Sequence, residues 1–174
     1  MYKLRYVNPE QIRIALQKAA REGKRKNRQR NFLIIKTLSS SGIRVTELIE
    51  LIPHNINFNE GFFHIKGKGQ KIRVVDIPQE LCQLLQLYIE TNLIKTKDRI
   101  FPLTRDSIRK ITWKFGGANP HAFRHAYAIN LLRKTKNIRY VQKQLGHSSL
   151  NTTEIYLQFL EYEQEKKKID TLYE

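Results

Sequence analysis

Acidic residues, cysteine and long apolar runs are all scarce in this 174-residue sequence. Asp and Glu number 16 against 32 Lys and Arg, which gives a formal net charge of +16. Such an excess of cations predicts a polyanionic partner, with nucleic acid the first candidate and an acidic membrane surface the second. No apolar run approaches the ~20 residues that span a bilayer, and the basic N-terminus lacks the apolar core of a signal peptide. We therefore expect a cytoplasmic protein without a membrane partner.

Cys82 is the only cysteine, so no disulfide can form within one chain. Its apolar surroundings, LCQLLQLYI, favour a buried thiol in a reducing compartment. Among the five histidines, His121 and His125 have an i, i+4 spacing, but no acidic residue accompanies them as in HExxH. We expect neither a metal nor another cofactor. The length predicts one domain with a proper core, alone or with a small appendage.

Local signals predict an α+β fold, mostly α-helical, with a small three-stranded antiparallel sheet. Asn8-Pro9-Glu10 is typical of a helix start, and Gly42 has the position of a helix C-terminus. Between residues 55 and 78 the runs INF, FFHI and IRVVDI predict three strands. The basic run KRKNRQR at 24–30 opens a helix, and we expect it to contact a nucleic-acid backbone.

Further helices are expected at about 78–92, at 104–115, around 121–132, around 151–156 and over the tail. The second of these carries Arg105, Arg109, Lys110 and Lys114. We expect its apolar side chains to be mostly core: Ile108, Ile111, Trp113 and Phe115.

The C-terminal third carries the residues best suited to chemistry. His121 and Arg124 are three apart in a segment rich in alanine and leucine, so both leave the same face of a helix. An imidazole exchanges protons near neutral pH, and a guanidinium can hold a phosphate with two hydrogen bonds. Asn151 as N-cap, with Glu154 three residues on, predicts a short helix that aims the phenol of Tyr156. Together, His121, Arg124 and Tyr156 indicate attack of a tyrosine on a phosphodiester. Each of these residues alone would also suit an ordinary surface or core position.

Two further cations stand in suggestive places. Arg44 begins a helix among apolar residues, so we expect it to be partly buried and to need an anion, either Glu47 or a substrate phosphate. Lys68 lies between two glycines in a basic hairpin and can reach into a groove, where it could donate a proton or neutralise phosphate. The other cations of this hairpin are Lys66, Lys71 and Arg73.

Taken in order, these motifs resemble the tyrosine recombinase (phage integrase) family, in its Xer-like branch. SGIRVTEL is similar to the family's first arginine box, and IKGKGQKIRVVDIP to its lysine hairpin. HAFRHAYAINLL is similar to the HxxR box, and QLGHSSLNTTEIY to the box that holds a histidine and the nucleophile. The resemblance covers most of residues 8–160 and implies the catalytic-domain fold of the family.

The resemblance implies roles for the matching positions. Arg44 and Arg124 would hold the scissile phosphate and stabilise its transition state. Tyr156 would attack phosphorus, which leaves a 3′-phosphotyrosyl bond and a free 5′-hydroxyl. This chemistry would make the protein a site-specific recombinase that cleaves and rejoins DNA strands.

The resemblance also implies roles for three groups that move protons or bind phosphate. Lys68 would protonate the departing oxygen, His121 would assist proton transfer at the tyrosine, and His147 would bind the phosphate or stabilise the transition state. His125 is expected to pack or hydrogen-bond rather than react. Motif position favours Lys68 and Tyr156 over their rivals, which are Lys66, Lys71, Tyr127, Tyr140 and Tyr162.

The family implies double-stranded DNA as partner and four protomers on two DNA sites, from a monomer in solution. Residues 1–174 match a single catalytic domain, with residues from about 160 to 174 as a C-terminal helix that could dock onto a neighbouring protomer. The family's N-terminal core-binding domain is missing, and a partner recombinase or accessory protein could supply that clamp. A stand-alone short member and an excised catalytic domain both fit. The expected place of action is the nucleoid.

Two other functions remain open. A type IB topoisomerase-like enzyme would use the same chemistry but rejoin the original strand. A DNA-binding accessory protein could keep the fold without cleaving DNA.

Overall fold

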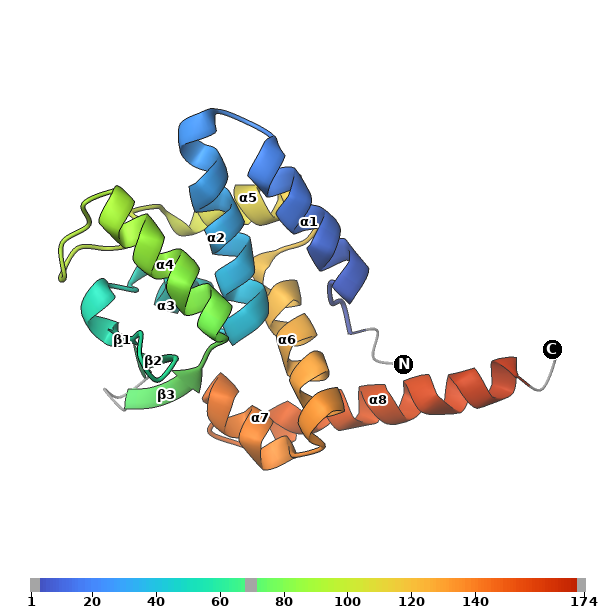
Figure 1. Cartoon of the computed structure of the whole chain (residues 1–174). Coiled ribbons are helices and arrows are strands. Elements are labelled where there is room, and N and C mark those ends of the chain that lie inside the picture. The colour runs from blue at the N-terminus through green and yellow to red at the C-terminus, as the bar shows by residue number, and fades with distance from the viewer. Residues whose placement is uncertain (1–3, 68–71, 172–174) are drawn as a thin grey trace.

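The computed structural model of the chain describes residues 4–67 and 72–171. Within these residues a small sheet lies at one edge of a mostly helical molecule (Figure 1). The N-terminal elements are α1 (Pro9–Arg21), α2 (Arg25–Ser41), α3 (Val45–Ile49), the 3-10 helix η1 (Pro53–Asn55), β1 (Ile56–Asn57), β2 (Phe62–Lys66) and β3 (Ile72–Asp76). The C-terminal elements are α4 (Gln79–Thr91), α5 (Arg105–Gly116), α6 (Pro120–Thr135), α7 (Ile138–Leu145) and α8 (Asn151–Asp170).

The sheet is antiparallel in the order β1-β2-β3, as its sequence pattern predicts. Phe63 of β2 lies opposite Ile56 of β1 and Val75 of β3. Alternate side chains of β2 point to opposite faces, so Phe63 and Ile65 are buried while His64 is exposed. One face of the sheet therefore packs on the core and the other meets solvent.

The first core fills the space between α1, α2, α4, α5 and the sheet. α1 begins with a capping box in which Asn8 and Gln11 bond each other's backbone N–H groups. α2 ends at Gly42, which has φ +61°, and a Cβ there would lie 2.3 Å from the ring of Tyr127 on α6. Only glycine combines that conformation with so close an approach, so α2 and α6 can cross tightly. Cys82 is buried in this core, as expected.

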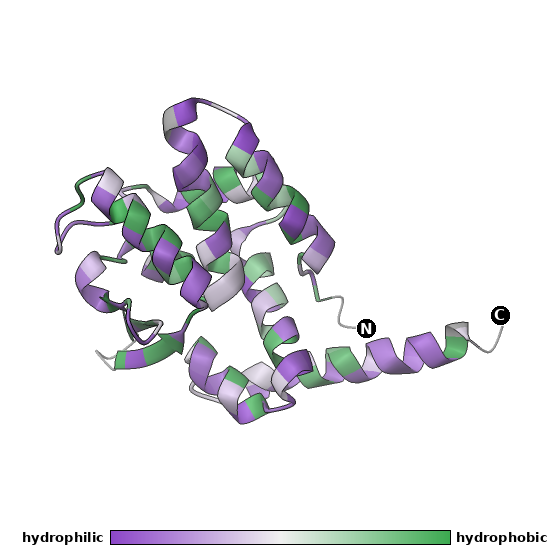
Figure 2. Ribbon diagram, viewed as in Figure 1, coloured by the Kyte–Doolittle hydropathy of each residue, from purple (hydrophilic) through white to green (hydrophobic). Residues whose placement is uncertain are grey.

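A second, smaller core lies between the C-terminal half of α6, α7 and α8. The N-terminal segment joins it, because the ring of Tyr6 packs edge-on against Phe159 at 5.2 Å. α6 contributes to both cores, with Phe123 in the first and Ile129 in the second. Hydrophobic and hydrophilic residues alternate along these helices (Figure 2), as expected of helices that pack on a core with one face. No helix among the described residues has both the length and the apolar character needed to cross a membrane.

Three expectations about helices are corrected. Trp113 was expected in the core, but it is 55% exposed, because the inner face of α5 is already filled by Ile108, Thr112 and Phe115. Tyr156 and the tail share one helix, α8, since neither glycine nor proline interrupts residues 151–170. Asn151 is not the N-cap: Leu150 precedes the helix with helical dihedral angles and makes no side-chain cap bond.

Candidate active site

Arg124 lies at the junction of the two cores and is 2% exposed. Its Nη1 donates to the carbonyl of Gly42 at 2.6 Å, and its Nη2 donates to the carbonyl of Leu145 at 2.7 Å. These carbonyls end α2 and α7, so one side chain ties both helix ends to α6. A guanidinium has five N–H donors, so donors remain for a ligand such as a phosphate. Burial, and then the charge of Arg44, lowers the pKa of Arg124 to about 10, so it stays cationic at neutral pH.

Arg44 precedes α3 and is more open than its apolar neighbours suggest. Its side chain is 42% exposed, and its Nη1 lies 3.0 Å from Glu47. The backbone N–H of Arg44 also donates to Glu47, at 2.6 Å. Of the two expected partners, Glu47 is therefore the one that the chain itself supplies. The exposed part of the guanidinium is left facing solvent.

Glu47 forms ion pairs with two arginines, Arg44 and Arg73. Arg73 of β3 binds it with two hydrogen bonds, of 2.8 and 2.9 Å. Burial alone would raise the pKa of Glu47, but its hydrogen bonds to Arg73 and to the Arg44 backbone bring that pKa below its ordinary value. Glu47 therefore stays ionised and links α3 to the sheet.

Arg73, one of the cations of the basic hairpin, is turned toward the interior of the protein. Its side chain is 13% exposed and turns inward, and its Nε donates to the carbonyl of Gln144 at 3.2 Å. Burial of a charge requires a partner, and Glu47 supplies it. Arg73 thus fixes the strand that follows the lysine hairpin. Lys68 itself lies outside the described residues.

Three histidines near Arg44 and Arg124 have a lowered pKa: His121, His147 and His125, of which the last is described with Tyr156 below. His121 is exposed at the start of α6, and its pKa is lowered by partial burial and by the charges of Arg124 and Arg44. His147, just after α7, has its Nδ1 3.0 Å from the hydroxyl of Thr153 on α8. Partial burial, followed by the same two charges, lowers the pKa of His147 to about 4. Both imidazoles are therefore largely neutral at pH 7.

Tyr156 is 1% exposed in the second core, yet its hydroxyl has a polar partner. That oxygen lies 2.9 Å from Nδ1 of His125. Burial raises the pKa of the phenol, and the charge of Arg124 opposes this rise. The charge of Arg124 therefore acts on the Tyr156 hydroxyl, although the two residues come from different helices. His125 hydrogen-bonds, as expected, but its partner could not be foreseen because the two residues are 31 positions apart.

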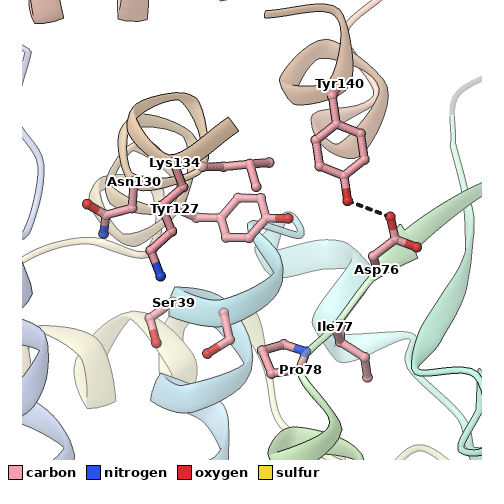
Figure 3. Close-up of a pocket in the computed structure, with 10 residues that line it drawn as sticks. Ser39, Asp76, Ile77, Pro78, Tyr127, Asn130, Lys134 and Tyr140 are labelled. Atoms are coloured by element: carbon pink, nitrogen blue, oxygen red, sulfur yellow. Dashed lines mark hydrogen bonds between the residues drawn. The ribbon is translucent and has the colours of Figure 1, made fainter. Parts of the chain in front are cut away.

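The rival tyrosines are engaged elsewhere. Tyr140 donates to Asp76 at 2.7 Å, and Tyr127 donates to Gln144 at 3.4 Å. Both line a pocket of about 390 Å³ between α2, α6, α7 and the start of α4 (Figure 3). None of the five candidate residues that the structure describes lines this pocket. Tyr162 is 46% exposed further along α8.

Comparison with solved structures identifies the fold as that of a tyrosine recombinase catalytic domain. XerH recombinase bound to a palindromic difH substrate, in a post-cleavage complex, is similar with a TM-score of 0.80 and 30% identity over 95% of this chain and 53% of that chain. The catalytic domain of bacteriophage HP1 integrase shares the fold, with a TM-score of 0.71, 20% identity, and coverage of 90% of this chain and 89% of that one.

Sequence comparison is consistent with this fold. Residues 5–162 match the phage integrase family. A tyrosine recombinase of Pseudothermotoga lettingae is 38% identical over 147 residues, which are 78% of this chain and 51% of that protein. Tyrosine recombinase XerA of Pyrococcus furiosus is 36% identical over 146 residues, covering 75% and 51%. The chain belongs to the phage integrase family, and it spans about half the length of these relatives.

Proposed function

We propose that this chain cleaves and rejoins DNA strands in site-specific recombination, with Tyr156 as nucleophile. The observation that carries the proposal is the position of the Tyr156 hydroxyl, which contacts His125 and feels the charge of the buried cation Arg124. Arg124 is held by two backbone carbonyls and stays cationic, so its remaining N–H donors are available for a phosphate. The family membership supports the same chemistry.

The proposed reaction is a transesterification at phosphorus. The Tyr156 oxygen forms a bond to phosphorus while the bond from phosphorus to the 5′ oxygen breaks. Arg44 and Arg124 hold the non-bridging oxygens, where charge builds up in the transition state. The products are a 3′-phosphotyrosyl ester and a 5′-hydroxyl. Because the ester retains the energy of the broken bond, reversal by another strand needs no ATP.

Two protons move in this step. The phenol loses one with the assistance of His121, whose exposed ring lies one helical turn from His125 on α6. The departing 5′ oxygen takes one from Lys68. His147 is neutral and its Nδ1 lies 3.0 Å from the Thr153 hydroxyl. In the tautomer whose Nδ1 accepts from that hydroxyl, Nε2–H is free to donate to the phosphate.

The DNA-binding face is expected to include α5 and the start of α2. α5 carries four exposed cations, and its C-terminal end leads directly into the helix that bears His121. Lys24 and Arg25 begin α2 and are also exposed. Phosphate contacts from such side chains position a protein on DNA without reading its sequence. The protein would act at the nucleoid.

Recombination would join two DNA sites through four protomers. The distal half of α8 is the candidate for contacts between them, because this helix projects beyond the body of the molecule (Figure 1). A partner recombinase could take the place of some copies. Truncation of this helix tests whether it holds the assembly together.

The deciding experiment traps the covalent intermediate. Wild type and Tyr156→Phe are incubated with nicked DNA or DNA bearing a 5′-bridging phosphorothiolate, in the presence of EDTA, and separated under denaturing conditions. We expect a protein–DNA adduct from wild type and none from the variant, which lacks only one oxygen atom. Tyr140→Phe is the matched control and should form the adduct. No adduct on a DNA site that the wild type binds would favour an accessory protein instead, and relaxed plasmid without recombinants would favour a topoisomerase-like enzyme.

A further inference from the structure

His125 is the residue that touches the proposed nucleophile. It lies on α6, one turn after His121, and the two rings meet edge-on with centroids 4.5 Å apart. Its other neighbour is the ring of Tyr156, at 5.7 Å between centroids and 57° between planes. Among the residues that the structure describes, the Nδ1 atom of His125 is the one hydrogen-bond partner of the Tyr156 hydroxyl, at 2.9 Å.

We infer that His125 is a positioning residue, whose Nδ1 accepts the hydrogen bond of the Tyr156 hydroxyl and directs its oxygen toward the phosphate. This inference rests on the proposed function. Packing holds the ring in place, and a hydrogen bond to the hydroxyl holds the oxygen more firmly and also fixes the O–H direction, because the O–H otherwise rotates about the C–O bond. An acceptor on α6, the helix that also carries Arg124, fixes the nucleophile relative to the phosphate-binding cation.

The protonation states agree with this direction of bonding. Burial, and then the charges of His121 and Arg124, lowers the pKa of His125 to about 4, so the ring is neutral at pH 7. The phenol keeps its proton because burial raises its pKa. Between a neutral imidazole and a neutral phenol, the O–H can donate to Nδ1 when the ring proton is on Nε2, and this is the tautomer that the inference requires.

The same surroundings make His125 a poor base for the reaction. Full transfer of the phenol proton to Nδ1 would create an imidazolium beside the buried cation Arg124 and against the ring of His121. Little solvent would reach that charge. No carboxylate is among the groups that shift the pKa of this ring, so none would stabilise the imidazolium. His125 therefore orients the hydroxyl, and the proton leaves by another group.

The test compares two substitutions of nearly equal shape. In His125→Asn the amide oxygen can take the position of Nδ1, whereas His125→Leu fills a similar volume without an acceptor. Adduct formation is followed in a single turnover at saturating protein, and DNA affinity is measured separately. We expect His125→Leu to slow the chemical step by about 10- to 100-fold with DNA affinity unchanged, and His125→Asn to recover most of that rate.

Equal rates for the leucine variant and wild type would overturn the inference, because filling the space would then suffice. Equally slow rates in both variants would also overturn it, because an acceptor at this position would then not restore the rate. A second measurement covers variants that fold poorly. Nitrogen NMR of the wild type should show an unprotonated Nδ1 at His125 whose resonance shifts in Tyr156→Phe, and a protonated Nδ1 would overturn the inference. Absence of any wild-type adduct would instead reject the proposed function.

Discussion

Two arginines bind consecutive carbonyls at the C-terminal end of α7. Arg73 reaches Gln144 from the sheet, and Arg124 reaches Leu145 from α6. Cations are stabilising at this end of a helix, because the unpaired carbonyls carry partial negative charge. The end of α7 is therefore fixed from two elements, and it lies just before His147. Residues that never touch a phosphate can in this way set where the histidine stands.

Gly146 allows this arrangement, and its replacement should be costly. It has φ +65°, and a Cβ there would lie 2.7 Å from Cδ of Arg73, which Glu47 holds in place. Gly117 is the matched control, because it ends α5 with φ +62° and has no atom within 4 Å of such a Cβ. We expect Gly117→Ala to lower the free energy of unfolding by about 1–2 kcal/mol. Gly146→Ala should cost roughly 1–3 kcal/mol more, through the added collision.

Urea unfolding of both variants measures the difference directly. Equal decreases in stability would mean that Arg73 moves aside at no cost, and that its bonds to Glu47 and Gln144 do not hold it. Adduct formation by Gly146→Ala should also be slower, by about tenfold, because the loop that bears His147 is displaced.

At the scale of elements, α8 combines a nucleophile with a projecting arm. Its first turns pack in the second core around Tyr156. Glu163 marks the end of the anchored part, where it pairs with Arg133 of α6 and accepts from the hydroxyl of Tyr6. Beyond it the side chains of residues 164–169 are exposed, and they include Ile169 at 55%. The arm is hydrophilic along most of its length (Figure 2).

Removal of the arm should separate assembly from cleavage. A chain that ends at Glu163 keeps the anchoring contacts, so its rate of adduct formation on a single site should stay within about twofold of wild type. Formation of the four-protomer complex on two sites should weaken by at least about tenfold, because the truncated protein can no longer pack this arm against a neighbouring protomer. Native gel electrophoresis with labelled sites resolves both species. Ile169→Ser is a milder control, and an unchanged assembly in the truncated protein would remove the arm from the interface.

Across the whole chain, the sequence correctly predicts those helix ends and strands that depend on local patterns. Asn8, Gly42 and Thr104 marked helix ends correctly, and alternation in FFHI gave a strand with one buried face. Contacts between segments that are distant in the sequence leave no local pattern from which they could be predicted. The pairing of Arg73 with Glu47 joins residues 26 positions apart, and only the folded chain shows that it turns a surface cation inward. Exposure of Trp113 likewise depends on how much of α5 its neighbours cover.

The excess of cations is also a whole-molecule property, and only part of it should bind DNA. Replacement of Arg105, Arg109 and Lys110 by Gln removes three charges from α5, and replacement of Lys166, Lys167 and Lys168 removes three from α8. Both variants change the net charge of +16 equally, to +13. If α5 binds phosphates, the slope of log affinity against log salt on a single site should fall by about 0.9 for each phosphate that the variant no longer neutralises. The α8 variant should keep the wild-type slope. Equal changes in both would mean that DNA responds to overall charge, and α5 would then not be a specific part of the interface.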